Sequence, residues 1–323
     1  MATDVDVSII IVNWNSAAYV QACVRSIYQH TRDVRFEIIV VDSGSFDDCG
    51  GMLAREHPQV RFIQSDKNVG FAKSNNLAAR GAEGRFLLFL NPDTEVRGPA
   101  LHKLFDAATA LPDAGALGAR LLNSDGTLQT SCLQAFPTIA NQVLDADLLR
   151  KWFPQARVWG TAALYAKTTD PIQVEGISGA CLMTSRAVFD RVGGFSEDYF
   201  MYYEDMDYCL KVRKAGRNNY FVPAAEVVHH GGKSSGGDYS RTASVVMAES
   251  GWRFFLAQHG RVYAALFRAC MATKAVSRCC MLACVRWLAP STRRREQAKA
   301  ALGKWVSILR WSFGGEKTAA RVP

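Results

Sequence analysis

The stretch VSIIIVNWN, residues 7–15, is a compact run rich in β-branched apolar residues that ends in two asparagines. A run of this length without polar alternation is typical of a parallel strand buried on both faces. Similar runs recur in FEIIVVDSGS (36–45), VRFIQS (60–65) and RFLLFLNPD (85–93), and the intervening segments 18–31 and 71–82 have helical spacing. This alternation predicts an α/β fold with a mostly parallel, doubly wound sheet and right-handed crossovers.

Polar side chains stand where these predicted strands end, namely Asn13, Asn15, Asp42 and Asp93. Ligands of doubly wound sheets bind at the carboxyl ends of the strands, so we expect these residues to share one site. A dinucleotide-binding dehydrogenase is excluded because VNWNSAAY, directly after the first strand, has none of the glycines of G-x-G-x-x-G. A phosphate-binding P-loop motif is absent as well.

The later part of the chain has shorter elements. Segment 118–138 contains short strands, and Asp125-Gly126 is the expected tip of a hairpin. Residues 174–195 predict a strand, a short helix and a turn marked by glycines, and 220–235 ends another strand at His229 and His230. A strand-end Asp93 with a histidine from elsewhere suits a hard divalent cation left open to a diphosphate, although Asn-Pro-Asp also favours a simple turn.

The segment YYEDMDYCLKVRKAG, residues 202–216, places Glu204, Asp205 and Asp207 in the first turn of a predicted helix. Acidic residues stabilise a helix N-terminus, and Gly216 suits the C-terminal cap, so capping alone explains part of the pattern. A general base is the alternative explanation, because acidic neighbours raise the pKa of a carboxyl group while the helix N-terminus lowers it. Glu204 and Asp207 are three residues apart and therefore share a face of the helix.

Composition places the chain among ordinary globular proteins, with 323 residues, 49% hydrophobic and 21% charged. The nine cysteines are an odd number without a Cys-x-x-Cys pair, which favours thiols in a reducing compartment over a disulfide framework. The N-terminal segment has acidic leading residues and too short an apolar run for a secretory signal. We therefore expect a cytoplasmic location.

The net charge of +8 is unevenly distributed. Residues 251–323 contain 14 Lys and Arg and two Glu, a net charge of +12, which leaves −4 for the first 250 residues. In residues 261–288 the five cationic side chains fall within an arc of about 140° on a helix, and apolar residues occupy the opposite side. No long uncharged run suggests a membrane span. The segment predicts a helix that either lies in the membrane interface or packs its apolar face on the protein.

Six segments in order carry a resemblance to a known family: VSIIIVNWN, IIVVDSGS, NVGFAKSNN, FLNPDTEV, the long segment 179–216 and VVHHGGKSS. Together they resemble the inverting glycosyltransferases of family 2, which have the GT-A (nucleotide-diphospho-sugar transferase) fold, and in particular their bacterial rhamnosyltransferase-like branch. The resemblance covers about residues 6–240. It implies a nucleotide-sugar donor, a hydroxyl acceptor, and inversion at the anomeric carbon.

The resemblance also implies roles for individual residues. Asn13, Asn15 and Asp42 would line the nucleoside site, and the loop with Asn68 and Gly70 would approach the nucleotide. Asn91 and Asp93 occupy the place of the family's Asp-x-Asp, so Asp93 would bind Mg²⁺ or Mn²⁺ together with His229. Asp205 would be the general base, and Glu204 and Asp207 would hold the acceptor or support the loop. The chain departs from the family at Asn91, which replaces an acid, and at Ser74, where glycine is common.

The donor that this branch favours is dTDP-L-rhamnose, with a UDP-sugar for galactofuranosyl or hexosyl transfer as the alternative. A catalytically silent nucleotide-sugar-binding protein is the competing class. We expect a catalytic domain at 1–245, with a donor half at about 1–115 and an acceptor half at about 116–245. Residues 246–323 would form a basic helical region on the cytoplasmic membrane surface, where a glycan or lipid-linked glycan acceptor would be found. The basic charge comes with no nucleic-acid-binding module, and no signal of an oligomeric state is present.

Overall fold

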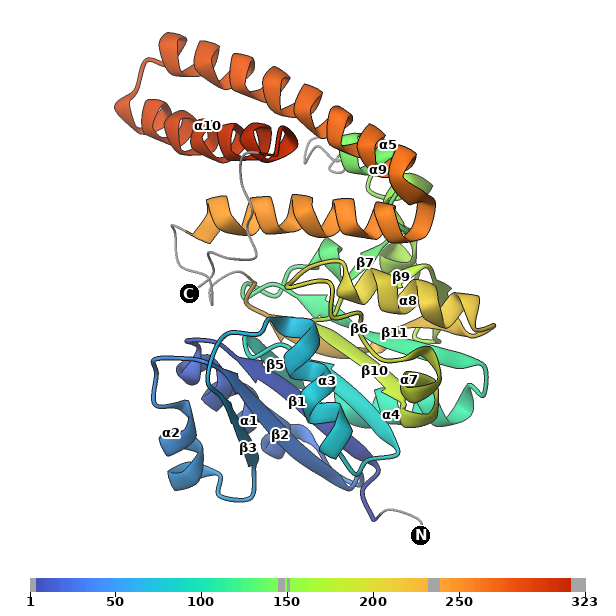
Figure 1. The fold of residues 1–323 in the computed structure, drawn as a ribbon. Helices are drawn as coiled ribbons and strands as arrows, with labels where there is room; N and C mark the ends of the chain where they lie inside the picture. The colour runs from blue at the N-terminus through green and yellow to red at the C-terminus, as the bar shows by residue number, and fades with distance from the viewer. Residues whose placement is uncertain (1–3, 145–148, 150–151, 232–238, 315–323) are drawn as a thin grey trace. The chain divides into compact units, whose positions relative to one another are not determined.

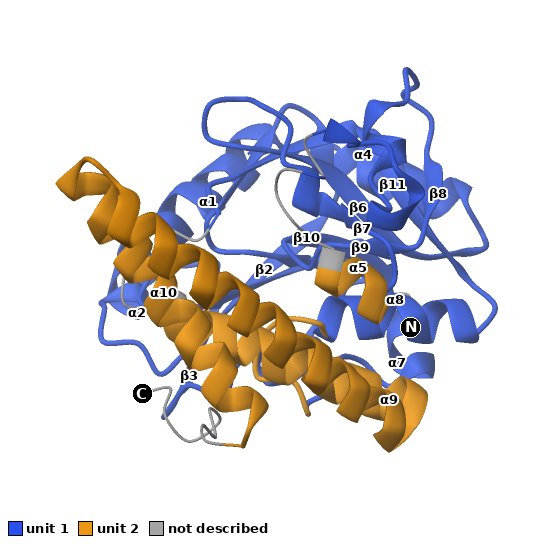
Figure 2. Ribbon diagram, turned by 90° about the horizontal axis from the view of Figure 1, so that it is seen from above, with its two compact units in different colours: residues 1–136, 147–197, 204–234 blue, residues 137–146, 198–203, 235–323 orange. Residues whose placement is uncertain are grey.

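The computed structural model describes residues 4–144, 149, 152–231 and 239–314. The chain divides into two compact units, coloured separately in Figure 2. The first, which we call the sheet unit, consists of residues 1–136, 147–197 and 204–234. The second, the helical unit, consists of residues 137–146, 198–203 and 235–323.

The sheet unit is built on a nine-stranded sheet in the order β3-β2-β1-β4-β10-β6-β11-β5, with β8 paired to β11 (Figure 1). Strands β1, β2, β3, β4, β6 and β11 run in one direction, and β5, β8 and β10 run against them. A two-stranded sheet of β7 and β9 completes the unit. The strands are β1 (Val7–Asn13), β2 (Phe36–Ser43), β3 (Arg61–Ser65), β4 (Phe86–Leu90), β5 (Thr94–Arg97), β6 (Ala114–Leu122), β7 (Leu133–Gln134), β8 (Ile172–Val174), β9 (Gly176–Ile177), β10 (Cys181–Ser185) and β11 (Asn218–His229).

Helices cover both faces of the large sheet, as the predicted doubly wound fold requires. In Figure 1, α3, α7 and α8 lie on one face, and α1, α2 and α4 lie on the other. These helices are α1 (Ala17–His30), α2 (Cys49–Glu56), α3 (Phe71–Gly81), α4 (Ala100–Ala110), α7 (Arg186–Val192) and α8 (Glu204–Lys214). Short 3₁₀ turns occur at Thr130–Cys132, Arg157–Trp159 and Ala162–Tyr165.

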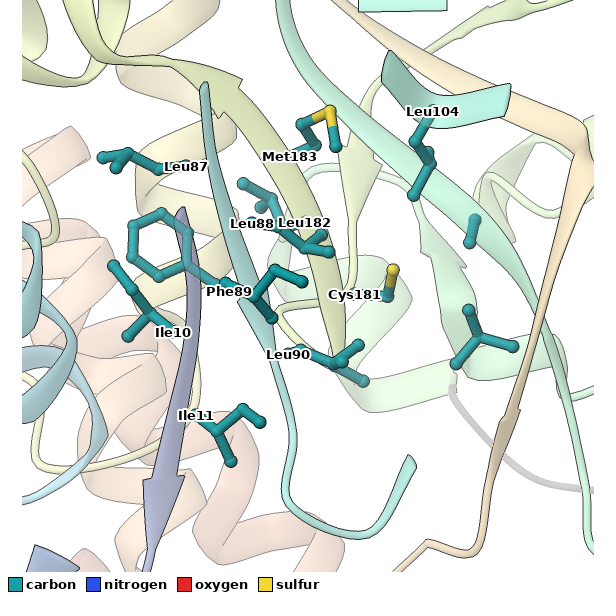
Figure 3. Close-up of a cluster of buried hydrophobic side chains, with 14 of the residues drawn as sticks. Ile10, Ile11, Leu87, Leu88, Phe89, Leu90, Leu104, Cys181, Leu182 and Met183 are labelled. Carbon is teal, nitrogen blue, oxygen red and sulfur yellow. The ribbon is translucent and has the colours of Figure 1, made fainter. Parts of the chain in front are cut away.

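The core of the sheet unit explains why its central strands are continuously apolar. Every residue of β1 and β4 is buried, and Figure 3 shows their side chains packed beside those of β10. Successive residues of a strand point to opposite faces of the sheet. Accordingly, the Phe89 ring contacts Phe195 on one side, with centroids 4.7 Å apart, while the Phe86 ring meets Phe105 of α4 at 5.7 Å. Both faces of the sheet are therefore dry, and the predicted fold is confirmed.

Strand register brings distant polar residues to one edge of the sheet. Parallel pairing of β1 with β2 sets Asn13 opposite Asp42. Antiparallel pairing of β5 with β11 sets His229 opposite Thr94, directly after Asp93. The carboxyl ends of the parallel strands thus carry the residues that the sequence predicts for the site.

The helical unit consists of α5 (Ile139–Leu144), α9 (Tyr239–Leu288) and α10 (Thr292–Ser312). Gly260, at φ 81° and ψ −178°, interrupts α9, so the helix has a first segment up to residue 259 and a second segment, 261–288. Only glycine adopts this backbone conformation readily. The predicted helix over 261–288 is therefore present. Within the described residues, no helix combines the length and apolar character needed to cross a bilayer.

Candidate active site

Two buried polar side chains, Asn13 and Asp42, lie opposite each other at the carboxyl ends of β1 and β2. Asn13 Nδ2 donates to Asp42 Oδ2 at 2.7 Å, and its Oδ1 accepts from the backbone N–H of Ser16 at 3.0 Å. Asp42 Oδ1 accepts from the Ser45 N–H at 2.8 Å and from Gln64 Nε2 at 2.9 Å. These bonds occupy three of the roughly four acceptor positions of a carboxylate. Asp42 therefore shapes the loop after β2 and has little capacity left for a ligand.

Asn15 ties the loop after β1 to the loop after β2. Its backbone, at φ 51°, is in the left-handed region, where asparagine is tolerated. Its N–H donates to Ser45 Oγ at 2.9 Å, and its Oδ1 accepts from the Phe46 N–H at 2.8 Å. Phe46 is 86% exposed, so this hydrogen-bonded loop presents a solvent-exposed aromatic ring beside the strand ends. Nothing in the sequence pattern marked Phe46 as a site residue.

The loop before α3 is held by Asn68. Asn68 Oδ1 accepts from the Gly70 N–H at 3.1 Å and from Ser43 Oγ at 3.2 Å. Gly70 has φ 84°, which suits a residue without a Cβ at the start of the helix. Ser74, where the related family commonly has glycine, is fully buried and its hydroxyl donates to Ser43 Oγ at 3.3 Å. This departure from the family pattern is therefore accommodated by a hydrogen bond to the adjoining strand.

Asn91, Asp93 and His229 meet where β4 and β11 end. His229 Nε2 lies 3.3 Å from Asp93 Oδ1 and 3.3 Å from Asn91 Nδ2. Asp93 is buried, and His229 is half-buried. His230 instead bonds Glu95 Oε1 through its Nε2 at 2.7 Å. Of the two adjacent histidines, His229 is thus the one that lies beside Asp93.

The tautomer of His229 follows from its other neighbour, Gln129. Gln129 Nε2 donates to Asn123 Oδ1 at 3.0 Å and to the His229 carbonyl at 3.1 Å. The Gln129 oxygen is therefore the atom that lies 2.6 Å from His229 Nδ1, so Nδ1 carries the proton. Nε2 is consequently the ring nitrogen that faces the Asp93 carboxylate and is left to ligate a metal ion, and no sequence pattern predicted that Gln129 would set this arrangement.

His229 Nε2 and Asp93 Oδ1, which lie 3.3 Å apart, are close enough to ligate one cation. Imidazole and carboxylate both ligate divalent ions such as Mn²⁺. Among the described residues, no group of three or more His, Cys, Asp or Glu side chains could hold a metal ion. Asp93 and His229 therefore fit an ion whose remaining ligands come from a bound diphosphate and water.

Asp205 lies in the first turn of α8 and is held by backbone groups. Its Oδ2 accepts from the Gly179 N–H at 2.9 Å, and its Oδ1 accepts from the Met206 N–H at 2.8 Å. The chain enters α8 through Tyr202 and Tyr203, each at φ 69°. Two consecutive aromatic residues in the left-handed region are unusual, and such strained backbone concentrates at functional sites.

The other two carboxylates of α8 have different surroundings. Asp207 is buried, accepts from Ser196 Oγ at 2.5 Å and pairs with Lys211 Nζ at 3.5 Å. It therefore ties the helix to the loop after α7. Glu204 is also buried, and its Oε2 makes no hydrogen bond within the described residues.

The surroundings change how readily the carboxyl groups ionise. Burial raises the pKa of Glu204 well above its usual range, and the adjacent Asp205 and Asp207 carboxylates raise it further. Burial also raises the pKa of Asp205, while the hydrogen bonds from Gly179 and Met206 act in the opposite direction. Desolvation thus outweighs the helix N-terminus at Asp205, which moves this carboxylate toward the range of a useful general base.

The segment before β10 lies between the Asp93–His229 pair and the N-terminus of α8. The Asn91 N–H donates to the Ala180 carbonyl at 3.0 Å, and the neighbouring Gly179 N–H holds Asp205. A Cβ at Gly179 would lie 3.4 Å from the Asp205 Cβ and 3.5 Å from the ring of Phe71, which begins α3. The structure therefore brings the Asp93–His229 pair, the start of α3 and Asp205 to neighbouring positions around one backbone segment.

The doubly wound sheet with helices on both faces is the fold of the GT-A-type glycosyltransferases. The chain belongs to glycosyl transferase family 2, whose family model matches residues 8–193. The family resemblance of the sequence motifs is thus confirmed, and the protein is an enzyme of the glycosyltransferase class.

Curated relatives include two rhamnosyltransferases. The N-acetylglucosaminyl-diphospho-decaprenol L-rhamnosyltransferase of Mycobacterium tuberculosis is 31% identical over 237 residues, 67% of this chain and 76% of the relative. The rhamnosyltransferase WbbL of Escherichia coli is 24% identical over 233 residues, 69% of this chain and 83% of the relative.

Solved structures share the fold at low sequence identity. The mannosyltransferase PcManGT of Pyrobaculum calidifontis, in complex with GDP-Man and Mn²⁺, superimposes with a TM-score of 0.58 at 18% identity, covering 98% of this chain and 92% of that one. GalNAc-T7 with UDP, GalNAc and Mn²⁺ gives a TM-score of 0.54 at 15% identity, covering 79% of this chain and half of that one.

Proposed function

We propose that the protein transfers L-rhamnose from dTDP-L-rhamnose to a hydroxyl group of a lipid-linked glycan, with inversion at the anomeric carbon, in cell-surface polysaccharide synthesis. The observation that carries this proposal is the Asp205 carboxylate, which two backbone N–H groups hold and whose pKa burial raises. The names of the two rhamnosyltransferase relatives support the sugar, and the decaprenol-linked substrate in one of those names supports the acceptor.

Donor binding is assigned to the strand ends of β1 and β2 and to the loop before α3. Asn13, Asn15 and Asp42 would shape the nucleoside site, since their hydrogen bonds fix both loops there. Asn68 and Gly70 would bring the start of α3 close to the nucleotide. The exposed ring of Phe46, whose backbone N–H is bound by Asn15, offers a flat surface on which a base can stack.

Asp93 and His229 would hold Mg²⁺ or Mn²⁺, and Asn91 would assist through its contact with the histidine. When bound, the ion supplies positive charge that stabilises the departing diphosphate. The residues themselves fix where that charge lies, because Gln129 sets the tautomer of His229 and strand pairing sets the position of Asp93. The solved neighbours named above carry Mn²⁺, which supports a divalent ion in this architecture.

Asp205 would act as the general base. The acceptor hydroxyl oxygen forms a bond to the anomeric carbon while the bond from that carbon to the diphosphate oxygen breaks. The hydroxyl proton passes to the Asp205 carboxylate, and the nucleoside diphosphate leaves. Asp207 would support the loop through Ser196, and Glu204 would help to hold the acceptor.

The proposal also assigns a separate function to each of three parts of the chain. Residues 1–115 would bind the donor, residues 116–245 would bind the acceptor, and residues 246–323 would associate with the cytoplasmic face of the membrane. The strongly positive charge of the last segment supports this assignment, because the inner leaflet carries anionic lipid.

Calorimetric titration of the purified protein with dTDP and with UDP, each with and without Mn²⁺ or Mg²⁺, tests the donor. Metal-dependent binding of dTDP, much tighter than that of UDP, is the expected result. Preference for UDP would replace rhamnosyl transfer with galactofuranosyl or hexosyl transfer. Binding of dTDP without turnover of dTDP-L-rhamnose on polyprenyl-diphosphate-linked N-acetylglucosamine would indicate a silent binding protein or another acceptor. Failure to bind either nucleotide would overturn the assignment.

A further inference from the structure

We infer that one exposed face of the second segment of α9 is a docking surface for a bilayer that contains anionic lipid. The inference rests on the proposed function, because a lipid-linked acceptor would require the enzyme to work at a membrane. The structural observations behind it all come from the helical unit.

The surface is a continuous apolar stripe. At 100° per residue, its side chains fall within an arc of about 80°, and they extend over about 38 Å of helix. Every one of them is exposed, and the interposed Thr273 is uncharged. The stripe consists of Val262, Leu266, Ala269, Val276, Cys280, Cys284 and Trp287. Val262 is 86% exposed, Leu266 53% and Trp287 82%.

Three of the five cations of this helix segment pack on its opposite side. Arg268 lies between two rings, with its guanidinium carbon 5.0 Å from the Trp311 centroid and 5.6 Å from that of Trp252. It also donates to the Trp311 carbonyl at 2.8 Å. Lys274 and Arg278 each lie 5.9 Å from the ring centroid of Trp305, on α10.

An ordinary amphipathic helix turns its apolar side inward and its charges toward water. This helix instead buries Ala264, Phe267 and Ala275 beside three packed cations and leaves a second apolar side exposed. In Figure 1, α10 runs beside the second segment of α9. Cation–π contacts link the two helices, and the side chains of the stripe face outward. A long exposed apolar patch marks an interaction surface in a soluble domain. A bilayer interface is a partner that accepts such a face without needing a complementary protein surface.

The charges at the edge of the stripe favour a membrane over a second copy of the chain. Arg261 and Arg286 are exposed along one edge, and Arg293 and Arg294 are exposed just beyond Trp287. Two stripes placed face to face would bring these positive edges together, which is unfavourable. Anionic headgroups would instead pair with them while Trp287 lies at the headgroup level.

The test is co-sedimentation of the full-length protein with vesicles of phosphatidylcholine alone and of phosphatidylcholine mixed with phosphatidylglycerol. The wild type should bind the mixed vesicles much more tightly. The double variant Leu266→Gln, Trp287→Gln should weaken that binding at least about tenfold, because it removes two apolar side chains from the contact. Met247→Gln is the matched control, since Met247 is 48% exposed in the first segment of α9 and lies outside the stripe.

Equal binding by the double variant, or no binding of the wild type to mixed vesicles, would overturn the inference. Concentration-dependent dimers that Leu266→Gln abolishes would assign the stripe to a second copy instead. Titration with dTDP on the same samples reports the donor site separately. If a variant loses vesicle binding but keeps dTDP binding and transfer to a water-soluble acceptor, the stripe is what has been disturbed. If the protein binds vesicles but does not transfer the sugar, the proposed function fails and the docking surface does not.

Discussion

Replacing Asp205 by asparagine removes the proposed base while changing the side chain least. A positioned general base contributes about 10²–10⁴ in rate, or about 2.7–5.4 kcal/mol of transition-state stabilisation. We therefore expect the turnover number of Asp205→Asn to fall by about that factor.

The structural cost of this substitution can be bounded from its two hydrogen bonds. The Gly179 and Met206 N–H groups each donate to a separate oxygen of Asp205, and an asparagine offers only one oxygen. One buried N–H then faces an amide NH₂, which costs about 1–3 kcal/mol, while loss of a buried negative charge offsets part of that cost. A domain is stable by about 5–15 kcal/mol, so the variant should remain folded.

The assay measures transfer of rhamnose from dTDP-L-rhamnose to a soluble polyprenyl-diphosphate-linked acceptor, together with the dissociation constant of dTDP. The expected result is a large fall in turnover number with unchanged dTDP affinity. Asp190→Asn, at an exposed aspartate at the end of α7, is the control and should keep full activity. The reasoning is refuted if folded Asp205→Asn retains more than about a tenth of the wild-type rate. It is also refuted if dTDP binding is lost together with transfer.

Three further predictions concern charge. Glu204→Gln should remain active and should remove a pH dependence of stability. Because the pKa of Glu204 is raised in the folded wild type, the folded state holds a proton that the unfolded state loses, so the free energy of unfolding falls as the pH rises from 4.5 through that raised pKa. Urea unfolding at several pH values should show this fall in the wild type and not in the variant. His229→Ala should raise the Mn²⁺ concentration needed for donor binding at least about tenfold, measured by calorimetry, because one of the two proposed protein ligands is lost. Arg268→Met should destabilise the helical unit by about 2–4 kcal/mol in thermal or urea unfolding, since the contacts with Trp252 and Trp311 and a charge-assisted hydrogen bond are removed.

Each of these three predictions has a control variant or an outcome that would contradict it. Activity lost in Glu204→Gln to the same extent as in Asp205→Asn would show that the two carboxylates act as one unit. His230→Ala, which removes the partner of Glu95, should leave the Mn²⁺ requirement unchanged. Arg261→Met, at an exposed position of the same helix, should alter stability by less than about 0.5 kcal/mol.

Local sequence was sufficient to predict four strands of the sheet, β1 to β4, and the polar residues that follow them. Buried parallel strands need uninterrupted apolar runs, so residues 7–13 and 36–43 could be assigned without tertiary information. Their terminal residues Asn13 and Asp42 then had to lie at one edge, because parallel neighbours end on the same side of a sheet. The acidic first turn of α8 was equally visible, since it requires only the composition of a few consecutive residues.

What the sequence by itself determined is therefore the apolar central strands, helices α1, α3 and α8, the helix over 261–288, and the polar residues that end the strands. Only the tertiary structure decided that His229 lies beside Asp93, that Gln129 sets its tautomer, and that the Gly179 N–H holds Asp205. These contacts depend on strand register and loop paths between residues far apart in the chain, which local periodicity does not encode. The direction in which α9 turns its arginines was undetermined for the same reason: periodicity defines two faces of a helix, and the partner on which it packs decides which of them faces outward.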